Sequence, residues 1–108
     1  MSLSLPPSIA LYISAANQSA TERVAECFTE DAIVQDEGKT MQGTEAIQDW
    51  VAETTRKYHH TMEPLSLRHE GGATVVTNRL TGAFPGSPIE VQFRFQLRAG
   101  KIAKLEIR

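Results

Sequence analysis

The sequence is poor in the features that mark secreted, membrane-bound and nucleic-acid-binding proteins. Cys27 is the single cysteine among 108 residues, which excludes an internal disulfide and fits a reducing environment, so we expect a cytoplasmic protein. No apolar run approaches the length of a membrane span. Residues 1–8 have neither the basic region nor the continuous apolar segment of a signal peptide. We therefore expect no membrane partner.

Charge and short motifs exclude further classes. Lys and Arg number 11 against 13 Asp and Glu, for a net charge of −2, and the cations are scattered, so we expect no nucleic-acid partner. Glycine-rich phosphate loops, nucleophile elbows and serine triads are missing. The histidines, His59, His60 and His69, have no carboxylate at ligand spacing. We therefore expect neither a metal ion nor another cofactor.

What is present is the composition of a single globular domain covering residues 1–108, with 41% apolar residues. In the first half, apolar residues recur at helical spacing and predict three helices, which lie at residues 9–16, 21–28 and 44–54. Thr44 is the expected N-cap of the third helix.

The second half has the alternating pattern of strands. The clearest is "IEVQFRFQLR" at 89–98, preceded by "ATVVTNRLTGAF" and followed by "KIAKLEIR". The segment "HHTMEPLSLRHEG" predicts a strand bent at Pro64. Helices followed by strands indicate an α+β domain in which a curved antiparallel sheet packs on three helices. We call this arrangement the cone, and we expect a pocket at its open end.

One carboxylate lies on the face of a predicted strand that we expect to point into the pocket. In "CFTEDAIVQDEG", Ala32, Val34 and Asp36 share one face of a predicted strand, because side chains alternate along a strand. Loss of hydration in an apolar pocket would raise the pKa of Asp36 toward the range useful for a base near neutrality. The alternative is that Asp36 is only the exposed charge that ends the strand. Both interpretations stay open at this point.

Parity and helical spacing also predict which other side chains face the pocket. Of the adjacent pair His59 and His60, only one can enter it, and His60 is the better candidate as a polar pocket group. Trp50 either lines the pocket or plugs it. The predicted lining comprises Tyr12, Ala16, Phe28, Val34, Trp50, His60, Val91 and Phe93.

Three segments carry a resemblance to a known family: "LYISAANQSATERVAECFTEDAIVQDEG", "MQGTEAIQDWV" and "FRFQLRAGKIAKLEI". Together they resemble the nuclear transport factor 2-like superfamily, and within it the SnoaL-like and steroid Δ-isomerase-like branch. The resemblance implies the same cone. It places Asp36 at the position of the isomerases' general base and Tyr12 at that of the tyrosine donating to the enolate oxygen. Their protonated aspartic acid falls on Val91 or Gln92.

The resemblance implies cofactor-independent proton transfer next to a carbonyl, of the isomerase, cyclase or dehydratase kind, on a small apolar or carbonyl-containing ligand. This fold also hosts non-catalytic binding modules and dimeric interaction modules with filled cores, and these alternatives stay open. The polar, lysine-poor outer face of the strands predicts a homodimer formed through the sheet. That face carries Arg79, Gln92, Arg94 and Gln96.

Overall fold

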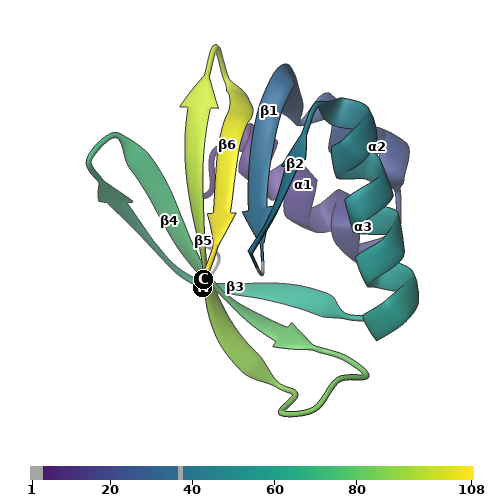
Figure 1. Cartoon of the computed structure of the whole chain (residues 1–108). Coiled ribbons are helices and arrows are strands. Elements are labelled where there is room, and N and C mark those ends of the chain that lie inside the picture. Colours follow the sequence, from purple (N-terminus) through teal and green to yellow (C-terminus); the bar gives the residue numbers. More distant parts are fainter. Residues whose placement is uncertain (1–3, 37) are drawn as a thin grey trace.

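The structure, a computed structural model, describes residues 4–36 and 38–108. These described residues form three helices and six strands (Figure 1). In chain order they are α1 (Pro7–Asn17), α2 (Thr21–Glu26), β1 (Phe28–Asp36), β2 (Lys39–Gln42), α3 (Thr44–Tyr58), β3 (Thr61–Glu70), β4 (Ala73–Thr81), β5 (Ile89–Arg98) and β6 (Lys101–Ile107).

The strands form one curved sheet in the order β2-β1-β6-β5-β4-β3. The predicted α+β class, with a curved sheet and three helices, is confirmed. One detail differs: β1 and β6 pair in parallel, whereas all other neighbours are antiparallel. Alternating patterns define strands but do not encode the relative direction of two strands far apart in the chain. The sheet is therefore mixed, with a single parallel pair.

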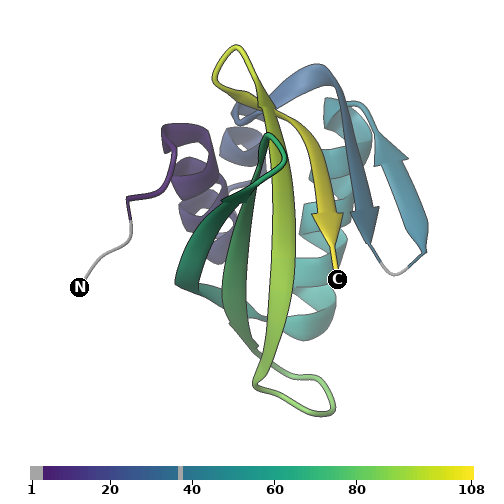
Figure 2. The same ribbon diagram turned by 90° about the vertical axis from the view of Figure 1, so that its left-hand side faces the viewer.

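The helices lie together on the concave face of the sheet (Figures 1 and 2). The core fills the space between the two layers and contains side chains from both. Cys27 is part of it: its thiol donates to the Arg23 carbonyl at 3.3 Å, and burial raises its pKa to about 11. This cysteine therefore behaves as a small buried apolar residue.

Strand parity is as predicted along β1. Ala32 and Val34 are both 0% exposed, whereas Asp31 and Gln35 face outward. The predicted bend of β3 at Pro64 is also present, as a shift of register between Pro64 and Ser66 in its pairing with β4. The inward faces of these strands are therefore those that the sequence indicated.

The N-cap of α3 was predicted wrongly. The cap is Gly43, with φ of 89°, and Thr44 is the first helical residue. The Gly43 N–H donates to the Ala32 carbonyl at 2.9 Å, which holds the backbone in a turn that glycine adopts without steric cost. Contact with the neighbouring strand therefore decides where this helix begins.

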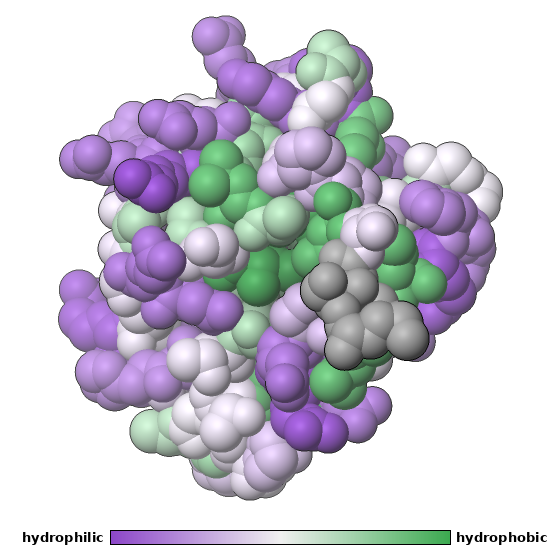
Figure 3. Space-filling view, turned by 180° about the vertical axis from the view of Figure 1, so that it is seen from behind, coloured by the Kyte–Doolittle hydropathy of each residue, from purple (hydrophilic) through white to green (hydrophobic). Residues whose placement is uncertain are grey.

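Apolar side chains gather at the centre of the face seen in Figure 3, and polar side chains surround them.

Within residues 4–36 and 38–108, no helix is both long and apolar enough to cross a membrane.

One polar side chain is fully buried in the sheet. Asn78 is 0% exposed, and neither amide atom has a hydrogen-bond partner among the described residues. The side chain of Asn78 is on the same face of β4 as that of Val76, a core residue, and Asn78 pairs with Val91 of β5. A buried polar group without a partner costs about 1–3 kcal/mol.

We expect Asn78→Val to raise the free energy of unfolding by about 1 kcal/mol, because the variant removes unpaired polar atoms and valine favours strands. Asn17→Ala is the control. The Asn17 side chain exchanges two hydrogen bonds with the backbone of Met62, at 2.9 and 2.7 Å, so its loss should destabilise. Urea unfolding measures both variants. A less stable Asn78→Val variant would contradict the prediction and indicate that an ordered water satisfies the amide.

Candidate functional site: the cavity of the cone

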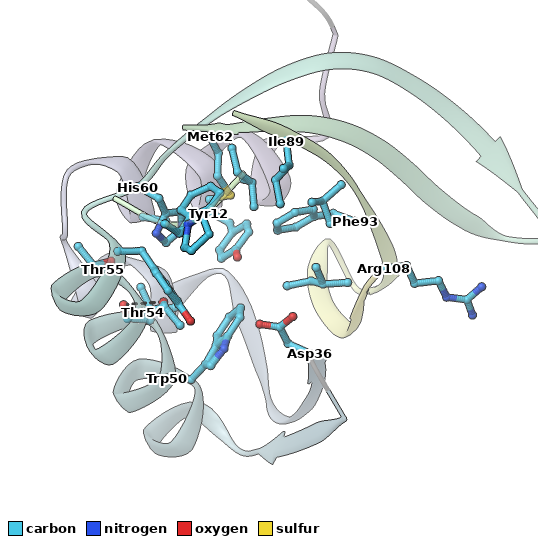
Figure 4. A pocket seen from close by; sticks show the side chains of 18 residues that line it. Tyr12, Asp36, Trp50, Thr54, Thr55, His60, Met62, Ile89, Phe93 and Arg108 are labelled. Carbon is cyan, nitrogen blue, oxygen red and sulfur yellow. Dashed lines mark hydrogen bonds between the residues drawn. The ribbon is translucent and has the colours of Figure 1, made fainter. Parts of the chain in front are cut away.

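A cavity of about 580 Å³ lies between the helices and the concave face of the sheet. This volume suits a small organic molecule. Its walls are mainly apolar and aromatic (Figure 4). The lining residues are Tyr12, Ala16, Asp36, Trp50, Val51, Thr54, Thr55, Tyr58, His60, Met62, Leu80, Phe84, Pro85, Ile89, Val91, Phe93, Ile107 and Arg108.

Tyr12 reaches the cavity from α1 and is held by aromatic contacts. Its ring, 2% exposed, meets Phe28 edge-on with centroids 5.6 Å apart and Phe95 with centroids 6.0 Å apart. Burial raises the pKa of the Tyr12 phenol well above its usual value, and the nearby charge of Asp36 raises it further. The phenol is therefore neutral at ordinary pH and able to donate a hydrogen bond.

Asp36, the last residue of β1, is the one acid among the described lining residues. It is partly buried, and Figure 4 shows its carboxylate beside Trp50, on the same cavity as Tyr12. A carboxylate and a neutral phenol therefore open onto one largely apolar space. That pairing can remove a proton at one atom and stabilise negative charge at another.

Trp50 lines the cavity and does not plug it. It projects from α3 (Figure 4) and lines both the main cavity and a smaller hollow of about 300 Å³. Asp36, Thr54 and Tyr58 also line both spaces. The indole thus borders both spaces and lies beside the side chain of the candidate base.

His60 enters the cavity from the connection between α3 and β3. His59, the C-cap of α3, adopts the left-handed conformation with φ of 47°, and it is exposed while His60 is half-buried. Burial lowers the pKa of His60, and the Thr54 carbonyl partly opposes this effect. The His60 Nδ1 atom is buried and has no hydrogen-bond partner among the described residues.

The loop between β4 and β5 closes the His60 end of the cavity. The Ala83 N–H donates to the Tyr58 carbonyl at 2.7 Å. A Cβ on Gly82 would lie 2.7 Å from that same carbonyl oxygen and 2.8 Å from the His60 Cα. Only glycine permits this approach. The contact brings Phe84 to within 5.9 Å of Tyr58, ring centroid to ring centroid, and places Phe84 in the wall.

Most of the side chains predicted for the pocket meet in this cavity, but Phe28 and Val34 do not line it. Both face the concave side, as parity required, yet both are buried in the core at 2% and 0% exposure. Val34 is the inward-facing residue of β1 two positions before Asp36, and it packs in the filled core. Parity gives the face of a strand but not the depth at which the filled core ends.

Sequence reasoning missed a second group of lining residues. Thr54 and Tyr58 follow Trp50 at intervals of four along α3, so helical spacing contained the signal. Phe84 and Pro85 lie in a loop, where no periodicity exists to place them. Among the described residues, no group of three His, Cys, Asp or Glu side chains could hold a metal ion.

A sheet curved around three helices, with a mainly apolar cavity at its open end, is the nuclear transport factor 2-like architecture. The model of the SnoaL-like domain matches residues 9–105. The chain belongs to this family. No curated protein matches the chain.

Solved structures agree with this assignment. A protein from Sinorhizobium meliloti, provisionally named a polyketide cyclase, is 35% identical with a TM-score of 0.92, over 96% of this chain and 95% of that one. A protein from Catenulispora acidiphila with a ketosteroid isomerase-like fold, in complex with trimethylamine, is 18% identical with a TM-score of 0.84, over 97% and 86%. A cystatin-fold protein from Novosphingobium aromaticivorans is 18% identical with a TM-score of 0.79, over 99% of both chains.

The lowered pKa of His60 predicts how stability changes with pH. As pH falls through the ordinary histidine value of 6.5, the unfolded chain takes up a proton before the folded chain does, which favours unfolding. We therefore expect the melting temperature to fall between pH 7.5 and pH 5.5, and to fall less for His60→Gln. Carboxylates with lowered pKa, such as Glu70, lose their contribution at lower pH, outside this window.

The control is His59→Gln, which changes the adjacent, exposed histidine and should leave the pH dependence of the wild-type chain intact. Melting curves at the two pH values decide the matter. Equal losses of melting temperature in wild type and His60→Gln would contradict the prediction.

Proposed function

We propose that the cavity binds a small, largely apolar carbonyl compound and catalyses cofactor-independent proton transfer at the carbon next to its carbonyl. The observation that carries this proposal is the meeting of Asp36 and Tyr12 in one apolar cavity, close enough for the charge of Asp36 to act on the Tyr12 phenol. Asp36 is the base in this proposal, and Tyr12 is the hydrogen-bond donor.

The reaction follows from the two groups. The Asp36 carboxylate takes a proton from the carbon, and negative charge moves onto the carbonyl oxygen, where the Tyr12 O–H stabilises the enolate. The protonated Asp36 then returns the proton to another carbon, as in an isomerisation. Alternatively, the enolate carbon attacks a second carbonyl carbon of the same substrate, whose C=O π bond opens and whose oxygen takes the proton from Asp36, as in an aldol cyclisation. Apolar walls keep water from competing for either charge.

The family supports this assignment. The relative from Sinorhizobium meliloti is provisionally named a polyketide cyclase, and the fold is shared with a ketosteroid isomerase-like protein. The second candidate is a binding module that sequesters an apolar ligand without turnover, which the mainly apolar lining favours. The third, an interaction module with a filled core, is disfavoured by the open cavity of about 580 Å³.

We expect the chain to accelerate exchange of the C1 protons of 2-tetralone, an enolisable ketone, in D₂O. Asp36→Asn should slow this exchange by about 10²–10⁴-fold, as for loss of a general base. Tyr12→Phe should slow it by about 10²–10³-fold, as for loss of an oxyanion donor. Proton NMR follows the exchange directly.

Asp31→Asn is the matched control, since Asp31 is an exposed acid of the same strand; it should exchange the ketone protons at the wild-type rate. Melting curves establish that the variants fold. Binding of 2-tetralone without accelerated exchange by the wild type would overturn the catalytic proposal in favour of the binding module.

The outer face of the sheet is the surface that we propose for a homodimer. Glu70 accepts from Arg68 at 3.1 Å and from Arg94 at 3.0 Å, and these arginines flank Val75 in the sheet register. The result is a polar platform across β3, β4 and β5. Arginine-rich, lysine-poor surfaces are common at interfaces.

Light scattering should give twice the chain mass of 11.9 kDa for the wild type. Arg94→Glu should lower the measured mass toward that of a single chain, because it places a second negative charge beside Glu70. Arg56→Glu makes the same charge change on α3 and should leave the dimer intact. A wild-type mass of a single chain at high micromolar concentration would remove the proposal.

A further inference from the structure

His60 lies across the cavity from the candidate base. Asp36 ends β1, whereas His60 directly precedes β3, and the sheet order places β6, β5 and β4 between those two strands. Curvature of the sheet brings both side chains onto one cavity. In Figure 4 they lie on opposite sides of it, with Trp50 and Tyr12 between them. The cavity therefore has a polar group in each of two facing walls.

The imidazole is held in its place by the structure around it. The Gly82 backbone approaches so closely that a Cβ there would lie 2.9 Å from the His60 Cβ. The Tyr58 ring contacts the imidazole edge-on, with centroids 6.5 Å apart. The left-handed turn at His59 directs the chain from α3 into β3. A side chain fixed from three directions can present its polar atoms in a defined geometry.

The hydrogen-bonding capacity of this imidazole is not used up by the described residues. Nδ1 is buried and has no hydrogen-bond partner among them, so it lies out of a ligand's reach, but Nε2 is not among the buried unpaired atoms and His60 lines the cavity. The charged groups among the described lining residues are Asp36 and Arg108, and neither contributes to the pKa shift of His60, whose causes are burial and the Thr54 carbonyl. The ring therefore stays neutral near pH 7, with one donor and one acceptor nitrogen.

We propose that His60 is a specificity residue that hydrogen-bonds a hydroxyl group at the end of the ligand remote from the reacting carbonyl. This inference rests on the proposed function and narrows its substrate class to elongated, mainly apolar ketones with a second oxygen function. A hydroxyl both donates and accepts, so it satisfies either tautomer of the ring. A carboxylate could only accept from the ring, and its charge would be buried there without a counter-charge, which is costly.

The test compares 2-tetralone with 6-hydroxy-2-tetralone, in which the hydroxyl lies across the two rings from the ketone. Trp50 is the single tryptophan of the chain and lines the cavity, so its fluorescence reports binding of both probes. One added hydrogen bond predicts that wild type binds the hydroxylated ketone about three- to tenfold more tightly. His60→Phe should lose this preference while still binding 2-tetralone.

Two further variants separate binding from a structural role. His60→Gln keeps a donor and an acceptor and should retain the preference in part, which a merely structural effect would not produce. His69→Phe alters an exposed histidine outside the cavity lining and should behave as wild type. Absence of a preference in the wild type, or equal preferences in wild type and His60→Phe, would overturn the inference.

Asp36→Asn distinguishes this inference from the proposed function. The variant should lose proton exchange at C1 and yet keep the preference for 6-hydroxy-2-tetralone in binding. Loss of the preference in Asp36→Asn would mean that Asp36 binds the hydroxyl, and it would overturn the role of His60. Accelerated exchange without a preference refutes only the inference about His60, whereas a preference without exchange refutes only the catalytic proposal.

Discussion

The packing of Tyr12 against Phe28 and Phe95 is the interaction on which the rest of the cone depends. It joins α1 to β1 and β5, so one aromatic cluster holds the helical layer on the concave face of the sheet. Aromatic contacts of this size contribute to stability and fix relative orientation. The same cluster sets the inner boundary of the cavity, because the Tyr12 ring belongs to both the core and the wall.

Two polar groups of the cavity, Asp36 and His60, lie at or next to the ends of elements. Asp36 ends β1, and His60 follows the C-cap of α3. Both side chains are only partly buried, so their burial costs less than it would in the core. The middle of each element carries the apolar packing. Tyr12 is the exception, because it belongs to the core and also lines the cavity.

The fold and one wall of the site were predictable from the sequence. Alternation in β1 placed Asp36 inward, and helical spacing in α1 placed Tyr12 inward, because both periods are fixed by backbone geometry. Phe28 and Val34 were placed in the wrong layer, since periodicity carries no information on depth. Phe84 was missed because its position depends on the approach of Gly82 to Tyr58 and His60, a contact between segments distant in sequence.

The parallel pairing of β1 with β6 has a consequence for how the chain acquires its structure. Between β1 and β5 the sheet contains only β6, the last strand along the chain. During synthesis, α1, α2, β1, β2 and α3 therefore emerge before the strand that joins β1 to β5 has been made. Such long-range pairing slows folding and exposes unpaired edges meanwhile. The edge of β1 that pairs with β6 therefore stays unpaired until β6 has been made.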